Sequence, residues 1–228
     1  MGPGLLIALF VVVAIGIAWG SWYFKKKRRE ELAFMARQLG LSYSPEDTQG
    51  CIGLPFALLR QGDGRGTENV LWGTWQQMPL TEFDYWYYEE STDAQGHHSK
   101  TYHRFSCAVT EIDAACSQLT IDRENFFTRI ADSIGLDDIQ FETTEFNDAF
   151  NVKSKDRKFA NDFVDQRMMA WLLGIGAEFR FETCGAWLLC FCKKRAPAEL
   201  VPLLGTLQQF RDQVPRVVFD LYRRGGVG

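Results

Sequence analysis

The chain has 228 residues, with 25 lysines and arginines against 29 aspartates and glutamates and a formal net charge of −4. Five of the basic residues stand together at positions 25–29, so 20 basic residues remain against 29 acidic ones. This acidic balance excludes a domain that binds nucleic acid through its phosphates, because such a domain needs a basic surface. The roughly 190 residues beyond the basic cluster are enough for one domain with a sizeable core.

The stretch over 4–24 has no charged residue, and it predicts a transmembrane helix behind a short external tail at 1–3. As a helix it rises about 31 Å, which matches the hydrocarbon core of a bilayer. Trp19, Trp22 and Tyr23 gather at its end, where amphipathic rings favour the level of the lipid headgroups. A cleaved secretory signal has its basic residues before the apolar run rather than after it, so we expect this segment to be retained.

The basic residues that follow predict a juxtamembrane segment over 25–30 that contacts anionic lipid headgroups of the bilayer. They are Lys25, Lys26, Lys27, Arg28 and Arg29. Because positive residues stay on the cytoplasmic side, we expect a single-pass protein of the cell membrane with its N-terminus outside and its soluble domain in the cytoplasm. Gly16 and Gly20 have the spacing of a helix-pairing motif, which predicts a homo-oligomer through these two glycines.

The remaining chain predicts a soluble α+β domain over 31–222 and a flexible tail over 223–228. The spacing of apolar residues over 32–39 is that of one helix face, and Gly40 suits a helix end. Residues 44–69 are expected to form mostly loop. The glycines at 62–66 precede a strand instead of following one, so we interpret them as a turn and not as a phosphate-binding loop.

Seven segments carry the signals of strands, and short turns join most of them. They span 69–76, 80–90, 101–112, 118–122, 138–143, 178–183 and 186–192. Such connections favour a mostly antiparallel sheet, with one hairpin tip at 91–100 and another turn at Cys184-Gly185. Seven strands followed by a C-terminal helix also match the order of elements in pleckstrin-homology domains.

Helices are expected to pack against this sheet. The apolar spacing predicts one helix around 127–134 and one or two helices over 157–173, where Asp156 is the expected N-cap. A clear amphipathic stripe predicts a C-terminal helix over 200–214, and Pro215 separates it from a last short helix.

Three segments together resemble an uncharacterised bacterial family of single-pass, membrane-anchored proteins with one soluble domain of unknown function. They read "LLRQGDGRGTENVLWGTWQQMPLTEFDYWYY", "TEFNDAFNVKSKDRKFANDFVDQRMMAWLL" and "LVPLLGTLQQFRDQVPRVV". The resemblance covers most of residues 31–222 and implies a membrane-bound bacterial protein. It implies no activity, and therefore no catalytic residue.

No pattern in the sequence indicates a catalytic residue, a cofactor or a metal site. His103 and Cys107 share one face of a predicted strand but lie about 13 Å apart, too far for one ion. His97 and His98 fall in the predicted hairpin tip. The six cysteines lie in apolar, strand-like stretches, which favours free thiols in a reducing compartment over disulfides.

The aromatic segment 83–88 is the strongest indication of a binding surface. Its odd positions point to one face of the strand and its even positions to the other. Tyr85 and Tyr87, with His103 on the next strand, are the candidate surface for a ligand or partner, because such side chains are typical of interfaces. Burial in the core is the alternative.

Asp84 lies between these rings and needs a partner if it is buried, and Arg104 on the next strand is the expected one. Together the patterns favour a membrane-anchored binding or scaffolding domain with a protein partner on the cytoplasmic side, rather than an enzyme. The alternative is a membrane-associated hydrolase with a site assembled from distant residues. An enclosed pocket with perturbed carboxylates beside Tyr85 or His103 would favour that alternative.

Overall fold

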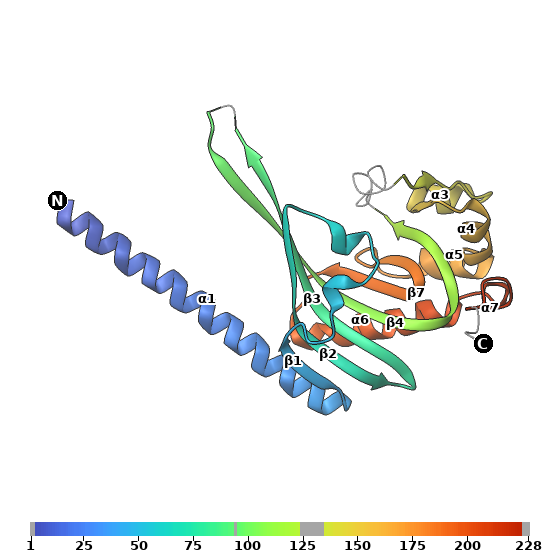
Figure 1. The fold of residues 1–228 in the computed structure, drawn as a ribbon, viewed down its shortest axis with the longest axis horizontal. Coiled ribbons are helices and arrows are strands. Elements are labelled where there is room, and N and C mark those ends of the chain that lie inside the picture. Colours follow the sequence, from blue (N-terminus) through green and yellow to red (C-terminus); the bar gives the residue numbers. More distant parts are fainter. Residues whose placement is uncertain (1–2, 94, 124–134, 225–228) are drawn as a thin grey trace.

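In the computed structural model, which describes residues 3–93, 95–123 and 135–224, the described strands form one antiparallel sheet of seven (Figure 1). They are β1 (Ser42–Glu46), β2 (Gly64–Trp75), β3 (Met78–Thr92), β4 (His98–Asp122), β5 (Asp137–Asp138), β6 (Asn151–Ser154) and β7 (Arg180–Lys193). The predicted α+β class with a mostly antiparallel sheet is therefore confirmed.

β4 is the strand around which the sheet is organised. It pairs with β3 on one edge from His98 to Val109, and with β7 on the other edge from Phe105 to Ile121. Its last residues, Leu119 to Asp122, pair with β6, which takes the edge that β3 has left. The pairing of β4 with β7 is irregular after Glu111. Because such bulges bend a strand, β4 curves here, between its segment paired with β3 and its segment paired with β6 (Figure 1).

The helices lie around this sheet, joined by short 3₁₀ turns. They are α1 (Pro3–Leu39), α3 (Thr144–Ala149), α4 (Arg157–Phe163), α5 (Gln166–Gly174), α6 (Leu200–Gln213) and α7 (Arg216–Leu221), with turns η1 (Cys51–Gly53), η2 (Leu58–Arg60) and η3 (Pro197–Glu199). The expected N-cap is confirmed, because the Asp156 carboxylate accepts from the Phe159 N–H at 2.9 Å. Asp165 caps α5 in the same way. The helix expected around 127–134 lies outside the described residues.

The first face of the sheet is closed by helices. The predicted stripe of α6 is buried, and its members Leu200, Leu204, Leu207 and Phe210 have no exposed surface. Leu32 in the C-terminal part of α1 joins the same core. Each buried side chain of this kind contributes about 1.5–3 kcal/mol of transfer free energy, so α6 and the end of α1 hold this face shut.

The second face has a separate core under an irregular loop. Phe83, Tyr85 and Tyr87 form it with Phe56–Leu59 of the loop between β1 and β2. The buried Glu182 carboxylate fixes the loop, because it accepts hydrogen bonds from the backbone N–H groups of Ala57 and Leu58. Burial raises the pKa of Glu182 to about 7.

The predicted transmembrane helix over 4–24 is wrong. α1 is one uninterrupted helix that continues through the basic segment into the domain. Within the described part of the chain, no helix has a stretch that is both long and apolar enough to cross a membrane.

Arg28, which we expected at lipid headgroups, instead fastens α1 to the sheet. Its guanidinium donates to both carboxylate oxygens of Asp84, at 2.8 and 2.6 Å, and to the Arg195 carbonyl at 2.7 Å. The Lys194 ammonium lies 3.0 Å from the same carboxylate. Asp84 is thus paired with Arg28 and Lys194, and Arg104, the partner expected from the sequence, is exposed.

Two expectations about the strands are also wrong. The predicted turn at Cys184-Gly185 is part of the continuous strand β7, where Gly185 has a φ of 59° and takes up an irregularity against β4. β1 and β6 fall in stretches that carry no strand signal of their own. The strand order β1-β2-β3-β4-β6-β5, with β7 beside β4, places the last strand next to the middle of the sheet.

Candidate functional site

The structure buries the tyrosines of the candidate surface. Tyr85 has no exposed surface and Tyr87 is 4% exposed, both in the second core. The His103 ring is stacked on Tyr87 at 4.7 Å between centroids, and its Nε2 lies 3.4 Å from a Glu89 oxygen. The expected alternation of faces is confirmed, but Tyr85 and Tyr87 offer no open surface to a ligand.

The β3–β4 hairpin projects from the body (Figure 1), and two even positions of the aromatic segment, Trp86 and Tyr88, are half-buried on it. Trp86 and Tyr88 lie 6.3 and 5.4 Å from Tyr102 between ring centroids. Gly66 on β2 makes room for the indole, because a Cβ there would lie 2.9 Å from the Trp86 ring. The Lys100 ammonium lies 4.3 Å from the centre of the Tyr88 ring.

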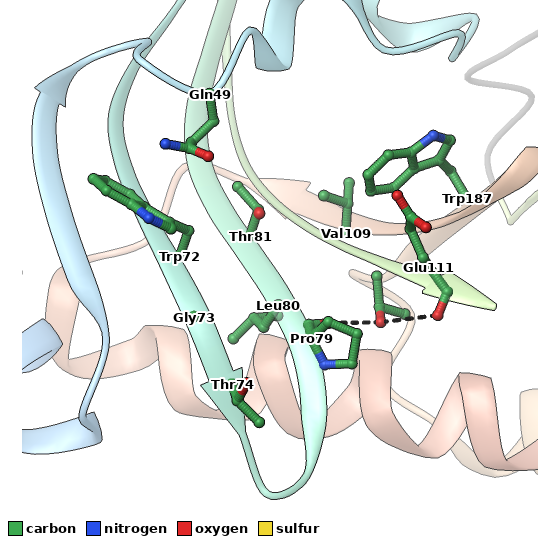
Figure 2. A pocket seen from close by; sticks show the side chains of 11 residues that line it. Gln49, Trp72, Gly73, Thr74, Pro79, Leu80, Thr81, Val109, Glu111 and Trp187 are labelled. Atoms are coloured by element: carbon green, nitrogen blue, oxygen red, sulfur yellow. Dashed lines mark hydrogen bonds between the residues drawn. The ribbon is translucent and has the colours of Figure 1, made fainter.

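A groove of about 380 Å³ opens on the second face of the sheet, and we call it the tryptophan groove (Figure 2). Its walls are the half-buried indoles of Trp72 and Trp187. Its lining residues are Gln49, Trp72, Gly73, Thr74, Pro79, Leu80, Thr81, Val109, Thr110, Glu111 and Trp187. The groove has the mixture of apolar walls and a few polar groups that is typical of ligand sites.

Strand register explains why the two indoles face a shallow floor. Trp72 on β2 is paired with Thr81 on β3, and Thr81 is paired with Val109 on β4. Trp187 on β7 is paired with Glu111, two residues further along β4. β2 and β7 are three strand spacings apart, about 14 Å. The small side chains of Thr81 and Val109 thus form a floor between two large rings.

The polar groups of the groove are mostly uncharged. Gln49 comes from the loop above the sheet and lies over the groove near Thr81 (Figure 2). The Thr110 hydroxyl is already used, because it donates to the Pro79 carbonyl at 2.6 Å. Glu111 is the one charged residue of the lining, and the Arg224 guanidinium lies 3.1 Å from its carboxylate. The groove therefore suits a ligand without net charge.

The lining provides groups for binding but no set of groups for catalysis. A nucleophile needs an adjacent base, and acid–base catalysis needs titratable groups within hydrogen-bond reach of the substrate. The described lining has no serine, cysteine, histidine or lysine, and one carboxylate that is paired. Glu182, whose pKa is raised, is not part of this lining and holds the loop.

Other residues predicted from the sequence lie outside the groove, on α1. Trp19, Trp22 and Tyr23 are 69%, 55% and 51% exposed. Lys25, Lys26, Lys27 and Arg29 are exposed as well. If Gly16 or Gly20 had a Cβ, no described heavy atom would lie within 4 Å of it, so the helix-pairing surface is open. Contact of these residues with lipid or a second copy stays a prediction.

The tryptophan groove was not predicted. Both of its walls belong to predicted strands, but Trp72 and Trp187 come from opposite ends of the domain and become neighbours only through β3 and β4. The one local signal is that each tryptophan is flanked by strand residues whose side chains are smaller, as in "LWGTW" and "GAWLL". Such a signal is common in ordinary cores.

Comparison with known proteins identifies a related fold. No family model matches the chain, and no curated protein matches its sequence. A solved structure, the crystal structure of the mycobacterial trehalose monomycolate transport factor A, TtfA, matches with a TM-score of 0.55. The match covers 82% of this chain and 93% of that chain, at 13% sequence identity. At this identity the likeness concerns the fold alone.

Proposed function

We propose that this protein is a binding domain without catalytic activity, and that it holds an uncharged, amphipathic molecule in the tryptophan groove. The observation that carries the proposal is the pair of indoles on β2 and β7, which face a small floor and have hydroxyl and amide groups around them. Large rings supply contact area at a low cost in conformational entropy, and the polar groups fix the orientation of the ligand.

A sugar with an attached apolar chain is the ligand class that fits these groups best. The C–H-rich face of a sugar ring lies well against an indole, and its hydroxyls suit Gln49, Thr74 and Thr81 as hydrogen-bond partners. The chain would follow the apolar part of the lining, such as Pro79 and Val109. The fold shared with a transport factor for a trehalose derivative supports a role in holding such a molecule rather than converting it.

Calorimetric titration with octyl glucoside, below its micellar concentration, tests this proposal. We expect saturable binding that falls at least tenfold in Trp72→Ala and in Trp187→Ala. Trp86→Ala is the matched control, because that indole is also half-buried but does not line the groove. Equal binding by all four proteins would rule out the groove as the site, and release of glucose during the titration would show an enzyme instead.

We also propose that the protein works next to an anionic membrane surface. The exposed aromatic residues of α1 are followed directly by exposed Lys25, Lys26 and Lys27, and each cation near such a surface contributes about 1 kcal/mol. Sedimentation with phosphatidylglycerol vesicles tests this part. We expect the triple Lys→Gln variant to bind these vesicles much less, while neutral phosphatidylcholine vesicles bind neither protein. Equal sedimentation of both proteins would contradict it.

A further inference from the structure

A second hollow lies on the opposite side of β4 from the tryptophan groove, and three arginines converge on it. It has a volume of about 430 Å³, and we call it the arginine pocket. Its lining residues are Ile112, Asp113, Arg167, Arg211, Asp212, Val214, Arg216 and Phe219. Glu111 lines the groove and the next two residues of β4 line this pocket, so the two sites lie back to back on one strand.

The three arginines reach this pocket from three different helices. Arg167 stands in the first turn of α5, Arg211 in the last turn of α6 and Arg216 at the start of α7. α7 is held next to β4, because the Tyr222 carbonyl accepts from the Ala115 N–H at 2.6 Å. Figure 1 shows α7 at the end of α6, beside the curved end of β4.

None of these three guanidinium groups is paired with a carboxylate of a described residue. Arg167 donates to the backbone carbonyl of Asp212 at 2.8 Å, which fixes its position at the rim. By contrast, Arg28, Arg195 and Arg224 each have a carboxylate within 4.0 Å, at Asp84, Glu178 and Glu111. The lining has these three arginines against two aspartates, so the pocket has a net positive charge in a chain with an excess of acidic residues.

We propose that the arginine pocket binds an oxyanion of the phosphoryl type that is attached to an apolar group. Arginine forms bidentate hydrogen bonds with such anions, and a bound anion would relieve the repulsion between the three cations. Ile112, Val214 and Phe219 provide an apolar side to the same pocket. Asp113 and Asp212 at its edge leave the pocket with one net positive charge, which matches a singly charged phosphodiester better than a highly charged anion.

This inference is independent of the proposed function, and binding of a soluble phosphate ester to the whole protein tests it. The probes are inorganic phosphate and dihexanoyl phosphatidylglycerol, a singly charged phosphodiester, titrated separately by calorimetry at low salt. We expect the phosphatidylglycerol to bind about tenfold more tightly than phosphate, which corresponds to about 1.4 kcal/mol. Equal affinity for both probes would overturn the apolar part of the proposal, because the ester would then gain nothing from Ile112, Val214 and Phe219.

Variants of the two exposed arginines make the test specific. Arg167→Gln and Arg216→Gln should each weaken binding at least tenfold, and Arg167→Lys should also weaken it, because lysine keeps the charge but loses the bidentate geometry. Arg37→Gln removes an exposed arginine of α1 and is the matched control. Trp72→Ala should leave this binding unchanged, which separates the two sites. No binding of either probe, or equal binding by Arg167→Gln and the wild-type protein, would overturn the proposal.

Discussion

The two faces of the sheet are covered by different kinds of structure. On the first face, α6 and the end of α1 present apolar stripes that bury the larger core. On the second face, the loop with η1 and η2 covers Phe83 and Tyr85, whereas Gln49 is the one residue of this loop in the groove lining beside Thr81. We infer that the tryptophan groove is open because the loop between β1 and β2 is too short to cover it, and not because the strands below it are unusual.

Substitution of one large core residue on each face sharpens this comparison and should give the largest effect on stability. Phe210 of α6 is fully buried, with its ring centroid 4.4 Å from that of Phe181. We expect Phe210→Ala to lower the free energy of unfolding by about 4 kcal/mol, and Phe56→Ala in the loop by about 3 kcal/mol, because a loop collapses more easily around a cavity. Urea titration measures both. A larger loss in Phe56→Ala would contradict the distinction between the two covers.

Removal of the Asp84 carboxylate, which pairs α1 with the sheet, should give the next largest loss of stability. Asp84→Ala leaves Arg28 and Lys194 without their shared carboxylate, and loss of one partner of a buried pair costs about 3 kcal/mol. Glu90→Ala is the matched control, because Glu90 forms an exposed pair with Lys100 and such pairs contribute little. Urea titration again gives the values. Similar small losses in both variants would show that Arg28 does not hold α1 in place.

The carboxylate that fixes the loop should make stability depend on pH. The pKa of Glu182 is about 7 in the folded protein against an ordinary value of 4.5, so the folded state binds this proton more tightly. Its contribution to the free energy of unfolding is therefore complete below about pH 4.5 and falls as pH rises to about 7, by about 3 kcal/mol.

Glu182→Gln should remove this decline, because the amide has no proton to lose. The N–H groups of Ala57 and Leu58 contact different oxygens of the carboxylate, so the amide oxygen keeps only one of these hydrogen bonds and the variant should be less stable at every pH. Urea titrations at about pH 5 and about pH 7.5 compare the two proteins. All other titratable groups are present in both proteins. The difference in how the free energy of unfolding changes with pH is therefore due to Glu182. The same loss of stability in the variant would show that this carboxylate does not control the cover of the second face.

Local patterns in the sequence were sufficient for much of the fold. The spacing of Leu203, Leu207 and Phe210 predicted the buried side of α6, and Asp156 was correctly placed as a helix cap. The alternation over 83–88 also assigned the two faces of β3 correctly. These features depend on residues a few positions apart, so one sequence contains the whole signal.

Features that depend on distant partners were missed or misread. Arg28 is one of five consecutive basic residues, and only the position of Asp84 on the sheet distinguishes it from its neighbours. Gly185 suits a turn as well as a bulge, and the pairing of β7 with β4 decides between them. The tryptophan groove combines β2, β3, β4 and β7, so its walls have no relation to each other along the chain.

The indole N–H signals of the seven tryptophans test the central claim most directly. They are recorded by NMR during titration with octyl glucoside, and each is assigned by a single Trp→Phe variant. If the ligand binds in the tryptophan groove, the signals of Trp72 and Trp187 should shift together with one saturation curve. The signals of Trp75 and Trp171 in the first core should not shift. Unchanged Trp72 and Trp187 signals at saturating ligand would contradict the assignment of the groove as a binding site.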